Sequence, residues 1–194
     1  MKQLIFNLPT HFLALFKKTY SRVRYGFFLN KCGKKSYILF PSLINIPSTI
    51  NIGNNTIINS NSWLFSCDNK ATLTIGDNTQ VGHYFHCVCM NQIDIGEEVL
   101  IADRVFISDC SHDYSDISTS VVKSKLTPLN NVKIGYGSWI GEGACINGCS
   151  IGRHCVIGSN SVVTSDIPDY SVAVGAPAKV VKRYDFSSKQ WIKV

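Results

Sequence analysis

Aliphatic residues recur every six positions along most of this chain, and that period limits the fold more than any other feature. Glycine often follows the aliphatic residue, as in "IGNNT", "IGDNT" and "IGEGA". Such a unit predicts a short flat strand whose aliphatic side chain points inward and whose small residues allow a tight corner. The repeats form five series of three: Ile52, Ile58, Leu64; Ile75, Val81, Cys87; Ile95, Ile101, Ile107; Ile134, Ile140, Ile146; and Ile151, Ile157, Val163.

Three strands per turn predict an all-β prism, a parallel β-helix of about five coils, in which each coil is stable only against its neighbours. The period is interrupted only after the third strand of a coil. There the steps are eleven, eight, twenty-seven and five residues instead of six. Insertions that share one corner leave the core stack intact and place their loops side by side, which is how a repeat scaffold builds a site. The longest insertion begins "SDCSHDYSD" and carries His112.

The sequence therefore predicts three parts: a basic, aromatic, helical segment over 1–45, a β-helix over 46–183 with a loop at 108–131, and a short tail or helix over 184–194. Basic character belongs to the first part, because the first forty residues hold eight Lys and Arg and no acid. Aromatic and basic residues at helical spacing suit a helix on an anionic membrane surface, so residues 1–35 are candidates for peripheral membrane contact. A helix that caps the domain end is the alternative.

The sequence favours a cytoplasmic protein, at the inner face of the membrane if that segment binds lipid. No apolar run approaches the length of a spanning helix, and no secretory signal precedes the eight cysteines. The cysteines lack zinc-like spacing, so we expect small buried apolar residues and no metal. Nucleic acid is not an expected partner, because no stacking motif or later basic groove is present.

The repeat resembles the hexapeptide-repeat acyltransferases, left-handed parallel β-helix enzymes that work as homotrimers with active sites between subunits. The loop "SDCSHDYSD" looks like the catalytic loop of their sugar O-acetyltransferase branch. "GSWIGEGACI" and "VIGSNSVVTSDIPDYSVAVGAPAKVVKRY" look like its closing coils. The layout is similar to acetyltransferases of O-antigen, capsule and exopolysaccharide synthesis. Ala176 and Ser165 depart from that signature, at positions where Asn and Lys are usual.

Transfer of an acetyl group to a sugar hydroxyl needs a base with a pKa near working pH, and His112 is the candidate. A carboxylate could orient its ring, and Asp109 and Asp113 are the nearest in sequence. The sequence does not decide between them. We assign this role to Asp109 and regard Asp113 also as a candidate for acceptor binding. His83 and Asn91 are further acceptor-binding candidates, with an outward structural role as the alternative for His83.

The resemblance implies acetyl-CoA as co-substrate, bound along the closing coils. The backbone N–H of Glu142 would face the thioester oxygen, and Trp139 would lie beside the groove or at a subunit contact. The other matched positions for CoA are Gly141, Ser159, Thr164, Lys179 and Lys182.

Three other functions stay open at this stage. An N-acetyltransferase of a nucleotide-linked amino sugar would use the same base. A gamma-type carbonic anhydrase resembles the fold, but it needs three histidine ligands, and the loop of His112 holds no second histidine. A non-catalytic β-helix scaffold is the third.

Overall fold

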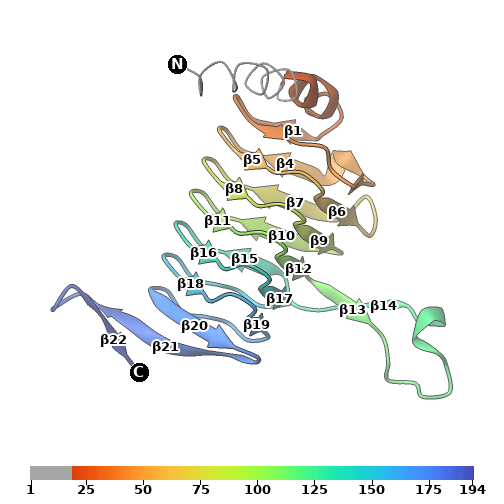
Figure 1. Ribbon diagram of the computed structural model, residues 1–194. Helices are drawn as coiled ribbons and strands as arrows, with labels where there is room; N and C mark the ends of the chain where they lie inside the picture. The colour runs from red at the N-terminus through yellow and green to blue at the C-terminus, as the bar shows by residue number, and fades with distance from the viewer. Residues whose placement is uncertain (1–18) are drawn as a thin grey trace, which may run out of the picture.

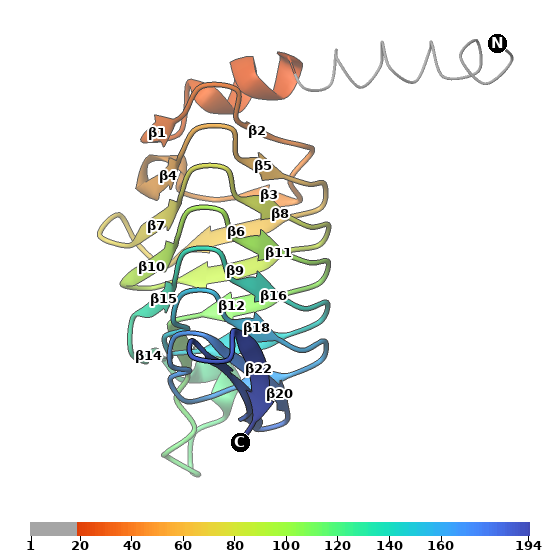
Figure 2. The same ribbon diagram turned by 90° about the vertical axis from the view of Figure 1, so that its left-hand side faces the viewer.

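Short strands stack in three parallel sheets that form the sides of a prism (Figures 1 and 2). The structure is a computed structural model and describes residues 19–194. The chain passes through the first, second and third face in turn. We call the bends that follow these faces the first, second and third corners of each coil. The third corner leads to the first face of the next coil.

The first face contains β1 (Lys31–Cys32), β4 (Ile50–Ile52), β7 (Thr72–Ile75), β10 (Gln92–Ile95) and β15 (Val132–Ile134). The second contains β2 (Tyr37–Ile38), β5 (Ile57–Ile58), β8 (Gln80–Val81), β11 (Leu100–Ile101), β16 (Trp139–Ile140), β18 (Val156–Ile157) and β20 (Ser171–Gly175). The third contains β3 (Leu43–Ile44), β6 (Trp63–Ser66), β9 (His86–Cys89), β12 (Phe106–Ser108), β17 (Cys145–Asn147) and β19 (Val162–Val163).

The aliphatic residues that recur every six positions form the core of this prism, as predicted. On the first face, Ile75 is in register with Ile52 above it and Ile95 below it. Ile95 is in turn in register with Ile134. These side chains have at most 1% of their surface exposed. Each aliphatic residue therefore packs on the equivalent residue of the next coil, and the stack is continuous.

The prism has about seven turns, so the predicted five coils are too few. The first turn uses Cys32, Ile38 and Ile44, which means that the β-helix begins near residue 31 and not at residue 46. The last turn is closed by Ile167 and Ala173. Both were missed because Cys32 is not aliphatic and because the third corner shortens to a four-residue step before Ile167.

The two ends of the prism differ from the prediction in different ways. Residues 19–26 are helical, and Ser21 fixes this turn by accepting the Ile38 N–H at 3.1 Å and donating to the Ile38 carbonyl. Residues 1–18, which hold the rest of the predicted N-terminal helix, lie outside the described residues. In the part of the chain that the structure covers, no helix has the length and apolar character to cross a bilayer.

The C-terminal residues are not a tail or a helix. They form β21 (Ala178–Asp185) and β22 (Gln190–Lys193), two antiparallel strands that extend the second face beyond β20. Figure 1 shows this hairpin curving away from the last coil. The edge of the second sheet is thus covered by its own chain, which protects the parallel strands from further pairing.

The three faces differ in what they present outward. The first is polar, with Asn51, Thr74, Asp94 and Lys133 on its surface. The second and third carry large apolar side chains. These include Leu100 and Trp139 on the second face, and Trp63 and Phe106 on the third.

Candidate active site

The long loop at the third corner projects from the prism and holds His112 in a short hairpin (Figure 1). Strand β13 (Cys110–His112) pairs antiparallel with β14 (Leu126–Pro128), and His112 lies opposite Leu126. A one-turn 3-10 helix, η2 (Val121–Lys123), lies in the outer part of the loop. The N–H of Asp113 donates to the Lys125 carbonyl at 3.0 Å, so backbone pairing continues past the histidine. His112 is therefore an exposed side chain on an ordered backbone.

His112 borders an open depression of about 350 Å³. Its other lining residues come from both strands of the hairpin: Ser111, Asp113, Tyr114, Ser115, Thr127 and Leu129. Sequence reasoning missed Thr127 and Leu129, because they belong to the aperiodic return of the loop. Only the antiparallel pairing brings them beside His112.

Asp109 is fully buried at the root of the loop, and its carboxylate is occupied by the backbone. It accepts the N–H groups of Met90, Asn91 and Gln92 at 2.6, 2.7 and 2.8 Å. These residues form the third corner of the preceding coil. A carboxylate that accepts several backbone N–H groups is strongly held, so Asp109 fixes where the long loop leaves the prism.

Asp113 is bound locally within the loop. Its Oδ1 accepts the Ser115 N–H at 2.9 Å and the Ser115 hydroxyl at 2.7 Å. These two hydrogen bonds hold the pKa of the Asp113 carboxyl below its usual value. Within residues 19–194, neither Asp109 nor Asp113 is hydrogen-bonded to the His112 ring.

Of the positions matched to CoA, Gly141, Glu142 and Ser159 lie on a different edge of the prism from His112, at the second corner. Gly141 is required there, since an added Cβ would lie 2.6 Å from the Ser159 backbone nitrogen in the next coil. The Glu142 carbonyl accepts the Asn160 N–H at 2.8 Å, and its side chain forms an ion pair with Arg104. Its own N–H has no acceptor among the described residues, so it can serve an incoming oxygen.

The other positions matched to CoA lie on the second sheet and, for Thr164, at a third corner. Trp139 is about half exposed on the second face, in register with Leu100 and Val156. Lys179 and Lys182 are exposed on β21, opposite Val174 and Val172, so they project on the outer side of the second sheet. Thr164 is exposed just after β19, at a third corner near the end of the prism.

The acceptor candidates fall on two corners. His83 is at the second corner, where its Nδ1 and the Ser60 hydroxyl are 2.9 Å apart and its N–H donates to Asp103 at 2.7 Å. Asn91 is exposed at the third corner, and its N–H is one of the three that bind Asp109. The structure therefore places Asn91 at the root of the His112 loop and His83 elsewhere.

His86 lies on the outer surface of the third face, between Trp63 and Phe106. The ring centroids are 5.5 and 5.1 Å from that of His86. Burial between these rings lowers the pKa of His86. Among residues 19–194, no group of three or more His, Cys, Asp or Glu side chains is arranged to hold a metal ion.

One chain thus carries the candidate base and the candidate oxyanion donor on separate edges. His112, Asp109, Asn91 and Asp113 belong to the third corner, whereas Glu142 follows a second-face strand. The chemistry that these groups suit is proton abstraction by an imidazole combined with stabilisation of an oxyanion by a backbone N–H.

Comparison with known proteins agrees with this reading of the fold. No family model matches the chain. WbbJ of Escherichia coli, whose name assigns it by inference to O-acetyl transfer in lipopolysaccharide biosynthesis, is 36% identical over 131 residues, which cover 64% of this chain and 67% of WbbJ. Rv3034c of Mycobacterium tuberculosis, named a probable acetyltransferase, is 42% identical over 119 residues, covering 61% of this chain and 39% of that protein.

Among solved structures, a variant of AntD, an N-acyltransferase from Bacillus cereus in complex with dTDP and coenzyme A, superposes with a TM-score of 0.72. The two are 21% identical, and the superposition covers 84% of this chain and 88% of AntD. The chain belongs to the hexapeptide-repeat acetyltransferases, in the branch that contains the sugar O-acetyltransferases. The family resemblance seen in the repeat is thereby confirmed.

Proposed function

We propose that this protein transfers the acetyl group of acetyl-CoA to a hydroxyl of a sugar in a surface polysaccharide, such as an O-antigen, capsule or exopolysaccharide. The observation that carries the proposal is the exposed His112 on an ordered hairpin in a chain related to WbbJ. An imidazole at this position can take the proton of a hydroxyl as it attacks, a contribution of about a hundredfold to ten-thousandfold in rate.

Acetyl-CoA supplies an acyl group activated as a thioester. The residues of this chain would orient it and bear the charge of the reaction. The free N–H of Glu142 would donate to the carbonyl oxygen as negative charge develops, while Gly141 allows the close packing on the next coil that fixes the position of this corner. Ser159, Thr164, Lys179 and Lys182 are the proposed contacts of the CoA chain and its phosphates, with Trp139 beside the groove.

His112 and Glu142 would meet across a subunit boundary, which leads us to a homotrimer. The third corner of one chain would face the second corner of its neighbour, so that each active site takes the base from one subunit and the oxyanion donor from the next. The apolar second and third faces provide surfaces that such an assembly would bury. Sedimentation equilibrium would test this: a monomer with full activity would exclude it.

The direct test of the reaction is thiol release from acetyl-CoA with nucleotide sugars and cell-envelope glycan fragments as acceptors. Mass spectrometry and alkaline hydrolysis of the product then identify the bond, since an O-acetyl ester is released by mild base and an N-acetyl amide is not. AntD is an N-acyltransferase, so an alkali-stable product would move this chain to the amino-sugar alternative. Absence of transfer to every acceptor would contradict the proposal.

We also propose that the N-terminal segment holds the enzyme against anionic lipid, with a lipid-linked glycan as acceptor. In its described part, Val23, Phe27 and Phe28 are well exposed, and Arg22 and Arg24 lie on the same helical turn. Apolar and basic side chains together favour binding at an anionic bilayer surface. Deletion of residues 1–24 should reduce co-sedimentation with phosphatidylglycerol vesicles, and unchanged co-sedimentation would contradict the idea.

A further inference from the structure

The first corner changes character at the end of the prism, where polar residues give way to an unbroken series of aromatic rings. Tyr136 contacts His154 at a centroid distance of 5.1 Å, and His154 stacks on Tyr170 at 5.6 Å. Phe186 then meets Tyr170 at 4.9 Å and Tyr184 at 5.1 Å. Trp191, 5.5 Å from Tyr184, ends the series. We call these six residues the aromatic track.

Two members of the aromatic track occupy a left-handed backbone position that recurs at the first corner of successive coils. Asn55 and Asn78 occupy the same left-handed position in upper coils, with φ of 53° and 56°. Asn tolerates positive φ, whereas Tyr rarely adopts it. His154 and Tyr170 nevertheless have φ of 49° and 54°. Lys35 and Glu98 hold the same position in other coils, with φ of 62° and 54°, so this corner accepts large side chains of any kind. What distinguishes the end of the prism is therefore the aromatic side chains and not the backbone.

The C-terminal hairpin completes a depression on the aromatic track. His154, Tyr170, Tyr184 and Trp191 line a volume of about 210 Å³. Tyr184 and Trp191 face each other across β21 and β22, and the Tyr184 N–H donates to the Tyr170 carbonyl at 3.0 Å. All of β22 is exposed. The second strand of the hairpin is therefore not needed to fill the core, but it does form one wall of the depression.

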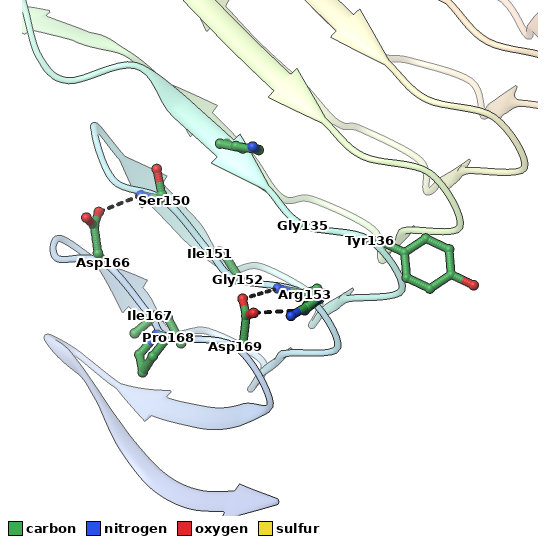
Figure 3. A pocket seen from close by; sticks show the side chains of 11 residues that line it. Gly135, Tyr136, Ser150, Ile151, Gly152, Arg153, Asp166, Ile167, Pro168 and Asp169 are labelled. Atoms are coloured by element: carbon green, nitrogen blue, oxygen red, sulfur yellow. Dashed lines mark hydrogen bonds and ion pairs between the residues drawn. The ribbon is translucent and has the colours of Figure 1, made fainter.

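A second depression, of about 630 Å³, adjoins the aromatic track on the first face (Figure 3). In it Arg153 and Asp169 point toward each other, with the Arg153 Nε donating to Asp169 Oδ2 at 2.9 Å. The Arg153 guanidinium also lies 5.4 Å over the Tyr170 ring. Asp166 accepts the Ser150 N–H at 2.7 Å through Oδ1, which leaves its second oxygen free for another donor.

We infer that the aromatic track and the depression beside it form a binding site for a neutral saccharide chain. A sugar ring packs the C–H groups of one face on an aromatic ring, while its hydroxyls need planar acceptors and donors such as carboxylate and guanidinium. Few polar groups placed among aromatic walls are typical of small-molecule sites.

Charge favours a neutral ligand over a phosphorylated one. In the first-face depression, Lys133 and Arg153 are balanced by Asp166 and Asp169. Carboxylates repel a phosphate group bound beside them, but they accept hydrogen bonds from hydroxyls. Lys182 and Lys193 do pair across the hairpin near Tyr184 and Trp191. A nucleotide phosphate is therefore the competing ligand that the experiment must distinguish.

The site lies on the first corner, whereas His112 is on the third and Glu142 on the second. It would hold a distal part of the acceptor glycan while another sugar of the chain reaches the base. This last step rests on the proposed function, but saccharide binding itself does not, so the two are measured separately.

The experiment uses the full chain labelled with 5-fluorotryptophan, without acetyl-CoA, titrated with maltohexaose and cellohexaose. The chain holds three tryptophans, Trp63, Trp139 and Trp191, and Trp191→Phe assigns the signal of interest in the ¹⁹F spectrum. We expect a saturable shift of the Trp191 signal, with those of Trp63 and Trp139 unchanged. Tyr170→Ala and Trp191→Ala should each weaken saccharide binding at least tenfold by isothermal titration calorimetry, and Tyr84→Ala, an exposed aromatic at the second corner of an upper coil, should not.

Tyr170→Ala removes packing at the end of the prism, so Trp191→Ala on the exposed strand serves if the first variant does not fold. A Trp191 signal that moves with neither hexasaccharide would overturn the inference. So would a shift produced only by adenosine 3′,5′-bisphosphate, which would reassign the hairpin to nucleotide binding. Saccharide binding in a protein that transfers no acetyl group would preserve this inference and contradict the proposed function alone.

Discussion

The inward strand positions and the third corner belong to the same coils, yet they follow opposite rules. Leu64, Ile101 and Ile146 have at most 1% exposed surface, and such positions recur at an unvarying spacing of six within each coil. The third corner ranges from a four-residue step to one of twenty-seven residues, and it exposes His112. Because a longer surface loop adds little entropic cost to closure, insertions there leave the stack undisturbed. The regular positions form the core of the prism, and the irregular corner carries the proposed base.

The largest expected effect is on catalysis at the third corner. His112→Ala should lower kcat/KM for acetyl transfer by about a hundredfold to ten-thousandfold, because the base is lost and the loop backbone is not. Thiol release under saturating acetyl-CoA measures it. Lys123→Ala, an exposed change in the same loop, is the matched control and should retain activity. Equal turnover by His112→Ala and wild type would mean that another group is the base.

The converse change, in the stacked core, should affect stability. Leu64→Ala removes a fully buried side chain from a packed stack and should lower the free energy of unfolding by about 2–5 kcal/mol. Ile117→Ala, at a fully exposed site in the long loop, should change it by less than about 0.5 kcal/mol. Urea denaturation at equal protomer concentration compares them. Similar losses in both variants would show that the loop is part of the cooperative core.

Asp109 links the third corner to the stacked core. A variant at this position can separate a structural role of its carboxylate from a catalytic one. Asp109→Asn leaves a buried amide facing backbone N–H donors, which should cost about 1–3 kcal/mol of stability. The acidic limb of the pH profile of kcat/KM should stay where it is. If Asp109 instead oriented His112, loss of its charge would lower the pKa of the imidazole, and that limb would move to lower pH.

The smallest effect concerns His86 on the third face. Its pKa is lowered by burial in the folded chain, so the unfolded chain binds the proton more readily. The stability associated with neutral His86 is therefore complete above its unfolded pKa of about 6.5 and is lost as the pH falls through the lowered folded value. His86→Phe should reduce the slope of the melting temperature against pH between pH 7 and pH 5. An unchanged slope would assign the pH dependence to other groups.

Much of the fold could be predicted because each coil repeats the same local structure. The spacing of Ile75, Ile95 and Ile134 in the sequence therefore predicts that they stack on one another. The first turn escaped detection because Cys32 takes the place of an aliphatic residue. The C-terminal hairpin was missed because it follows no period, and its pairing with β20 depends on an unoccupied sheet edge.

The sequence by itself determined the prism, its single variable corner and the acetyltransferase family, because a six-residue period and a short polar signature are local patterns. Only the tertiary structure decided that Asp109 binds the corner at 90–92, that Thr127 lies beside His112, and that Tyr170 and Trp191 share one depression. These contacts join residues from different coils or strands, whose separation in the chain carries no information about which side chains meet. The physical reason is that packing and hydrogen bonding between coils are settled by register, which exists only once the chain is folded.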